Sequence, residues 1–274
     1  MRCGGRTASS TYPWCRWSRS REARGDCWAC GALRAVWCDV RVWGVAVKVA
    51  VISANLGQGG YDQPAPWPDL IAPDGVEIDV IRLTDETFQP RPLAMTSRLQ
   101  CGIPKWFGAD FAPDASVIIW IDASCAPTPY AVSWFLAYLS SADIAVFRHP
   151  DRRTVRDEYE FVKARMARPG ETYLNSRYRG EDLEGVIAAI EREYRASDVW
   201  LYASTAFAYW SKRNHKVREA LAEVFAWKAR FHLHDQFAFP FVLMKHGLNV
   251  NVIPDNYLRC PALEFVRKGI RRSA

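Results

Sequence analysis

The sequence predicts an α/β domain in which helices flank a mainly parallel sheet. Short apolar runs alternate along the chain with longer amphipathic stretches, which is the order of strands and helices in such folds. The run at 116–121 is continuously apolar, as a central parallel strand buried on both faces should be. With 274 residues, 49% of them hydrophobic, the chain can bury a large core. We expect one domain over 47–261, preceded by 1–46 and followed by a basic tail, 262–274.

Strand patterns occur at six places. The first, 47–53, is a buried apolar run, whereas 76–83 alternates apolar and polar positions. The other expected strands are 116–121, 143–147, 199–210 and 249–253.

Three stretches have helical patterns. In 181–195 and 216–230, apolar residues recur at steps of three and four, so each is an amphipathic helix. Lys228, on the apolar face of the second, can extend its amine to solvent. Asp235 is placed to cap a third helix that ends near Gly247. Pro240 removes one backbone hydrogen bond in that helix and predicts a kink or a short 3₁₀ start.

The net charge of +6 does not indicate a nucleic-acid partner. Eight Arg and three acidic residues lie in 1–46, so the rest of the chain carries a charge of only +1. A nearly neutral body offers no basic stripe to a phosphate backbone. The excess of Arg over Lys fits a GC-rich coding sequence, of actinobacterial or phage origin.

Residues 1–46 hold five of the eight Cys and show neither helical nor strand periodicity. We interpret them as disordered, or as a spurious extension before a start near Val47. The remaining Cys101, Cys125 and Cys260 suggest no disulfide framework, which favours a reducing cytoplasm. No stretch has the length and apolarity of a membrane span.

A glycine-rich segment, Gly57-Gln58-Gly59-Gly60, follows the first expected strand. A dinucleotide-binding loop would need a further Gly leading into a helix, but Asp62 stands at that position and several prolines follow. The segment is therefore a flexible turn or a loop that closes over a nucleotide base.

Asp122 follows the continuously apolar run, in the sequence WIDAS. A carboxylate at the carboxyl end of a central strand lies where open α/β sheets bind ligands. Such a group could pair with a divalent cation that bridges a diphosphate. It could equally cap the loop that follows, and the residues alone leave both interpretations open.

Two further polar motifs are candidates for a site. His149 with Arg152 and neighbouring arginines, in 147–153, forms either a clamp for phosphate or acceptor hydroxyls or a solvated charged turn. In His234-Asp235-Gln236, Asp235 serves as a helix cap, whereas Gln236 is left to hydrogen-bond a sugar.

Taken in order, these motifs resemble a GT-A-type glycosyltransferase, and more specifically the glycosyltransferase-like domain shared by plant and bacterial proteins. The resemblance covers about residues 47–254 and rests on six pieces in a similar order and spacing. The pieces are VISANLGQGGYD, LTDE at 83–86, Arg98 with Pro104-Lys105, WIDAS, RHPDR followed by Glu158, and HDQFAF.

The resemblance implies a Rossmann-like sheet that binds a nucleotide-sugar, and a role for each matching residue. Asp122 would meet a metal ion and the donor diphosphate. Asp235 and Gln236 would lie near the transferred sugar, and His149 would also be catalytic. The implied donor-binding residues are Ser53, Ala54 and Asn55 at the nucleotide, Asp85 at the base or ribose, and Arg98 and Lys105 at the diphosphate. Ser124 and Arg152 are also expected to bind the donor.

One departure from the family pattern concerns the metal. Ser124 stands where a second Asp would complete the DxD motif, and no His follows His246 as a late metal ligand. The resemblance implies Mn²⁺ or Mg²⁺ bound by Asp122, but Lys105 or the arginines could supply the positive charge instead.

The resemblance implies transfer of a hexose-type sugar from a nucleotide-sugar, most simply a UDP-sugar. The acceptor is left open among a glycan, a protein, a lipid and a modified base. Catalysis would come from electrostatic stabilisation of the leaving diphosphate and from positioning. The alternative is a non-catalytic carbohydrate- or nucleotide-binding module with the same fold.

Overall fold

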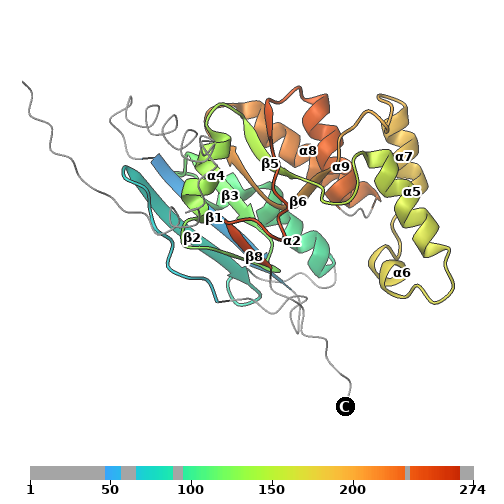
Figure 1. The fold of residues 1–274 in the computed structure, drawn as a ribbon, viewed down its shortest axis with the longest axis horizontal. Coiled ribbons are helices and arrows are strands. Elements are labelled where there is room, and N and C mark those ends of the chain that lie inside the picture. The colour runs from blue at the N-terminus through green and yellow to red at the C-terminus, as the bar shows by residue number, and fades with distance from the viewer. Residues whose placement is uncertain (1–46, 57–65, 89–94, 232–234, 266–274) are drawn as a thin grey trace, which may run out of the picture.

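The structure is a computed structural model that describes residues 47–56, 66–88, 95–231 and 235–265. Over these ranges, the chain forms a six-stranded central sheet with helices on both faces (Figure 1). This arrangement confirms the predicted α/β class. The strands of this sheet are β1 (Val47–Asn55), β2 (Val76–Thr84), β3 (Val117–Ile121), β5 (Ile144–Arg148), β6 (Tyr202–Trp210) and β7 (Val250–Ile253).

The strand order of the sheet is β2-β1-β3-β6-β5-β7. β1 pairs in parallel with β2 and β3, and β5 pairs in parallel with β7. β6 is antiparallel to both of its neighbours, β3 and β5. The sheet is therefore mainly parallel, as predicted, with one reversed strand that the sequence did not signal. Because β1, β2, β3 and β5 share one direction, they all end at the same edge of the sheet.

Side chains that alternate along the strands divide the core into two layers. In β1, Ala50 and Ile52 pack in one layer, and Val49 and Val51 pack in the other. β3 is buried along its whole length, which explains its continuously apolar sequence. The helices of the first layer are α2 (Ser97–Trp106), α3 (Gly108–Phe111), α5 (Val155–Met166), α6 (Tyr173–Arg177), α7 (Leu183–Glu191), α8 (His215–Phe231) and α9 (Asp235–Lys245), and α4 (Ala131–Leu139) packs in the second.

A second, two-stranded sheet holds the loop that follows the central strand β3. In it, β4 (Cys125–Pro127) pairs antiparallel with β8 (Leu263–Phe265). The Cys125 N–H donates to the Asp122 carbonyl at 2.9 Å, so the chain turns directly after Asp122. β8 lies past residue 261, within the segment expected to be a basic tail. A distant part of the chain thus fixes the exit from β3.

The observed helices differ from the expected ones mainly at their ends. α7 begins after residue 181 because the Asp182 carboxylate caps it, accepting from the Gly185 N–H at 2.8 Å, and it ends at Glu191, before the expected 195. α8 agrees with 216–230 to within one residue at each end. α9 runs through Pro240.

Several predictions fall on parts of the chain that the structure leaves undescribed, namely residues 1–46, the glycine-rich segment and His234. They stay predictions. Within the ranges given above, no helix is long and apolar enough to cross a bilayer. Cys101, Cys125 and Cys260 carry free thiols.

Candidate functional site

The carboxyl ends of the parallel strands bring four of the sequence motifs to one edge of the sheet. Asn55 ends β1, Asp85 follows β2, Asp122 follows β3 and His149 follows β5. Open α/β sheets bind their ligands outside this edge. The topology therefore places the candidate residues where a ligand is expected. The contacts of their side chains decide which of them are free to bind one.

An irregularity in β6 lies directly beside Asp122. Val146 of β5 pairs with Phe207, but the next residue, Phe147, pairs with Ala203, so the β6 residues between these partners bulge out of the ladder. The carbonyl of Thr205, in this bulge, accepts a hydrogen bond from the Asp122 N–H at 2.8 Å. Bulges often lie next to active sites, where they redirect side chains.

Lys105, in the last turn of α2, is the centre of a charged cluster at this edge. Its Nζ donates to Asp122 Oδ1 at 3.1 Å, to Asp235 Oδ2 at 2.7 Å and to Ser204 Oγ at 3.4 Å. The Lys105 side chain is only 6% exposed. An ammonium group has three N–H donors, so all of them have partners within the protein. Ser204 comes from the bulge of β6.

Asp235 receives a second lysine from α8. Lys228 Nζ donates to Asp235 Oδ1 at 2.7 Å, so each oxygen of this carboxylate has its own ammonium partner. The side chains of Lys228 and Asp235 are 7% and 11% exposed. The expectation that Lys228 extends to solvent is therefore wrong, because a buried carboxylate offers its amine an ion pair. Asp235 begins α9, and its side chain serves this ion pair.

Asp122 is the member of the cluster that solvent reaches. Its side chain is 33% exposed, and its Oδ1 accepts from the indole Nε1 of Trp120 at 2.7 Å as well as from Lys105. Within the described part of the chain, no hydrogen bond is recorded to its other oxygen, Oδ2. Lys105 and Trp120 thus hold one carboxylate oxygen of Asp122, and its side chain as a whole is partly exposed.

The two carboxylates keep Lys105 charged. Burial lowers the pKa of the Lys105 ammonium, but Asp122 and Asp235 more than offset this effect, and the pKa lies above its usual value. Burial raises the pKa of the Asp122 carboxyl, although the Lys105 ammonium and the Trp120 indole N–H oppose this effect. The contacts of the cluster have the geometry of ion pairs.

Among the described residues, the side chains that surround Asp122 leave no free set of ligands for a divalent metal ion. No group of three or more His, Cys, Asp or Glu comes together in the described ranges, and one or two carboxylates hold Mg²⁺ only where substrate phosphates and water complete its ligands. The two carboxylates that do converge, Asp122 and Asp235, already share the Lys105 ammonium. In the described part of the chain, the Lys105 ammonium thus lies between the two carboxylates.

His149 and Arg152 hold a turn after β5. The His149 side chain is buried, and its Nδ1 accepts from the backbone N–H groups of Asp151 and Arg152 at 3.2 and 3.1 Å. Burial and the nearby Arg152 lower the pKa of His149 to about 4, so the imidazole is neutral at pH 7. Arg152 forms an ion pair with the buried Glu158. Both side chains therefore already have partners that fix the turn.

The other predicted donor-binding residues lie outside the cluster around Lys105. Arg98 forms an ion pair with the buried carboxylate of Glu181 at 2.5 Å. The remaining positions are Ser53 and Ala54, buried in β1; Asn55, Asp85 and Ser124, half-buried after or at strand ends; and Gln236, half-buried on α9.

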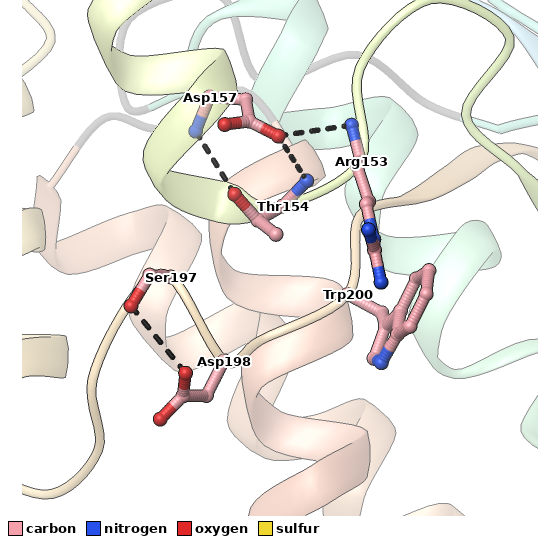
Figure 2. A pocket seen from close by; sticks show the side chains of 6 residues that line it. All are labelled: Arg153, Thr154, Asp157, Ser197, Asp198 and Trp200. Carbon is pink, nitrogen blue, oxygen red and sulfur yellow. Dashed lines mark hydrogen bonds between the residues drawn. The ribbon is translucent and has the colours of Figure 1, made fainter.

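Figure 2 shows the side chains that line a surface pocket between the start of α5 and the segment before β6. The pocket has a volume of about 450 Å³. Its lining residues are Arg153, Thr154, Asp157, Ser197, Asp198 and Trp200. Trp200 is 45% exposed, and the guanidinium carbon of Arg153 lies over its ring, 4.6 Å from the centroid. Most of the polar side chains bond with each other or with nearby backbone (Figure 2). By itself this pocket identifies no ligand.

Sequence reasoning missed three residues of the cluster. The position of Lys228 on the apolar face of a helix could have predicted its role, since a lysine there needs either solvent or a buried carboxylate. Trp120 stands within the motif around Asp122, but no pattern indicated that its indole N–H reaches the carboxylate. Ser204 gave no signal, because its position depends on the bulge in β6.

No family model matches the sequence, and no curated protein matches it either. Among solved structures, the chain is similar to mouse xyloside xylosyltransferase 1 in its apo form. That likeness has a TM-score of 0.40 and 12% sequence identity, and covers 76% of this chain and 85% of that chain. A similarity at this level does not assign an activity.

Proposed function

We propose that the protein transfers a sugar from a nucleotide-sugar, most simply a UDP-sugar, to an acceptor. The observation that carries this proposal is the cluster of Asp122, Lys105 and Asp235 at the edge where four parallel strands end. This edge is where α/β sheets bind nucleotides and their derivatives. The sequence resemblance implies the same donor for residues at the same edge.

Within this proposal, Asp122 Oδ2 accepts a hydrogen bond from a hydroxyl group of the sugar, while Oδ1 is held by Lys105 and Trp120. A carboxylate repels a diphosphate unless a cation lies between them, so direct contact of Asp122 with the phosphates is disfavoured. Asp235, with both oxygens held by lysines, is a fixed carboxylate close to the sugar. The positive charges of Lys105 and Lys228 stabilise the charge that develops on the leaving diphosphate.

A binding module without turnover is the second candidate. All three N–H groups of Lys105 and both oxygens of Asp235 have partners inside the protein, so the cluster is satisfied with no ligand present. Such a cluster can also serve structure alone. Both candidates predict that a nucleotide-sugar binds, and only the transferase predicts that its sugar is released or transferred.

The experiment measures release of the nucleoside diphosphate from a panel of nucleotide-sugars, with and without carbohydrate acceptors. In Asp122→Asn, which keeps the shape of the side chain, we expect turnover to fall by at least about 100-fold, as when one preorganised group is lost. Asp114→Asn, at an exposed position, is the matched control and should keep full activity. Unchanged turnover in Asp122→Asn would exclude Asp122 from the site. Binding by the wild-type protein without any turnover would support the module.

A further inference from the structure

Five side chains form an unbroken series of polar contacts at the edge of the sheet. Trp120 contacts Asp122, Asp122 contacts Lys105, Lys105 contacts Asp235, and Asp235 contacts Lys228. We call the four charged members, Asp122, Lys105, Asp235 and Lys228, the lysine–aspartate cluster. They come from α2, α8, the start of α9 and the end of β3. The cluster therefore joins three helices of the first layer to the end of the central strand.

The formal charges of the cluster match those of a metal-loaded site. Two ammonium groups balance two carboxylates, and one divalent cation between the same two carboxylates would give the same sum. Two carboxylates that share a largely buried site need such a balance, since an unpaired buried charge is costly. Lys105 Nζ lies within 3.1 Å of one carboxylate and 2.7 Å of the other, in the position that a bridging cation would take.

Lys105 is also held against displacement. Its Nζ lies 5.1 Å from the ring centroid of Trp106 and 5.8 Å from that of Trp120, so aromatic rings as well as carboxylates stabilise the ammonium. A divalent cation at this place would need oxygen ligands or water instead of aromatic faces. The surroundings of the ammonium thus favour an organic cation over a metal ion.

We propose that Lys105 and Lys228 together replace a divalent cation, so that the protein binds its nucleotide-sugar without metal, and that loss of Lys105 opens the carboxylate pair to a metal ion. The first half, donor binding without metal, rests on the function proposed above. The second half concerns the cluster alone and holds whatever the ligand is. The two halves can therefore be tested apart.

The test of the cluster is a Mn²⁺ titration of the full chain, followed by the electron paramagnetic resonance signal of the free ion. The wild-type protein should show no site tighter than millimolar. Lys105→Ala should gain one site at least tenfold tighter, because Asp122 and Asp235 then lack their shared ammonium. The double variant Lys105→Ala/Asp122→Asn should lose that site again. Lys216→Ala, an exposed position on α8, should behave as the wild type.

Two outcomes would overturn the proposal for the cluster. One is tight Mn²⁺ binding by the wild-type protein that Asp122→Asn abolishes. The other is a folded Lys105→Ala protein that gains no site. If Lys105→Ala does not fold, Lys228→Ala, which frees one oxygen of Asp235, is titrated in its place. The wild-type titration still tests whether the intact cluster excludes Mn²⁺.

Donor binding is tested with UDP and UDP-sugars on the wild-type protein, once with excess EDTA and once with Mn²⁺. We expect dissociation constants that agree within about twofold. Affinity that falls more than tenfold in EDTA overturns the metal-independent mode. If no nucleotide or nucleotide-sugar binds under either condition, the proposed function fails, while the Mn²⁺ titration still decides the nature of the cluster.

Discussion

Asp235 has a lysine at each carboxylate oxygen, and this makes Lys228 a sensitive position for stability. Lys228→Ala leaves Asp235 Oδ1 without its ammonium in the interior. Breaking one partner of a buried ion pair costs about 3 kcal/mol or more, mainly because the remaining charge is uncompensated. We expect urea unfolding to show a loss of that size. Lys216→Ala on the same helix should change the free energy of unfolding by less than about 0.5 kcal/mol.

His149 should make the stability depend on pH. Its pKa is lowered to about 4 in the folded protein from a usual 6.5, so between these values the unfolded chain binds more protons than the folded one. The stabilisation is therefore fully present above pH 6.5 and is lost as pH falls toward 4. After allowance for screening by solvent, we expect a loss on the order of 2 kcal/mol.

The measurement is urea unfolding at pH 7 and at pH 4.5. His149→Asn is the control, since an amide oxygen can still accept from the backbone N–H groups of Asp151 and Arg152 but does not titrate. The variant should lose less stability between the two pH values than the wild type. An equal loss in both proteins would show that other groups cause the pH dependence.

At the scale of secondary-structure elements, α5 depends on a capping box at its start. Thr154 accepts from the Asp157 N–H at 3.1 Å, and Asp157 accepts from the Thr154 N–H at 2.9 Å (Figure 2). Thr154→Ala should lower the free energy of unfolding by about 1 kcal/mol, while Thr154→Ser should keep most of it. Thermal or urea unfolding of the pair checks this. Equal stability of the two variants would argue against the cap.

α2 shows why a helix that carries part of the site escaped prediction. Its sequence contains Gly102 and Pro104, both of which disfavour the interior of a helix. A Cβ atom at Gly102 would lie 3.3 Å from the ring of Phe225, so α2 packs closely on α8 at this point. Close packing explains the glycine, and a local propensity argument cannot anticipate it. Lys105 follows directly after these two residues and was identified only through the resemblance.

For the whole molecule, the order of strands predicts the order of local opening. β3 and β6 lie in the middle of the sheet, and β3 is buried along its length, whereas β2 forms one edge and is largely exposed or half-buried. Backbone amides in central strands open only with global unfolding. Hydrogen exchange followed by mass spectrometry should therefore show β3 exchanging last and β2 earlier. Equal protection of the two strands would contradict this arrangement.

Local sequence patterns determined the α/β class and the positions of most strands of the main sheet. The run at 116–121 became β3 and the alternating run at 76–83 became β2, because burial on one or both faces acts on consecutive residues. The position of Asp122 at a strand end followed from the same pattern. Pattern alone did not show which partners this carboxylate has.

Only the tertiary structure decided the direction of β6 and the composition of the lysine–aspartate cluster. Lys105 and Asp235 are 130 residues apart in the chain, and the bulge that brings Ser204 to Lys105 arises where β6 meets β5. Such contacts depend on how separate elements pack, so no local pattern encodes them. The sequence predicted that Asp122 lies at a strand end. The ammonium group beside it could be identified only from the packing of α2, α8 and α9 against the sheet.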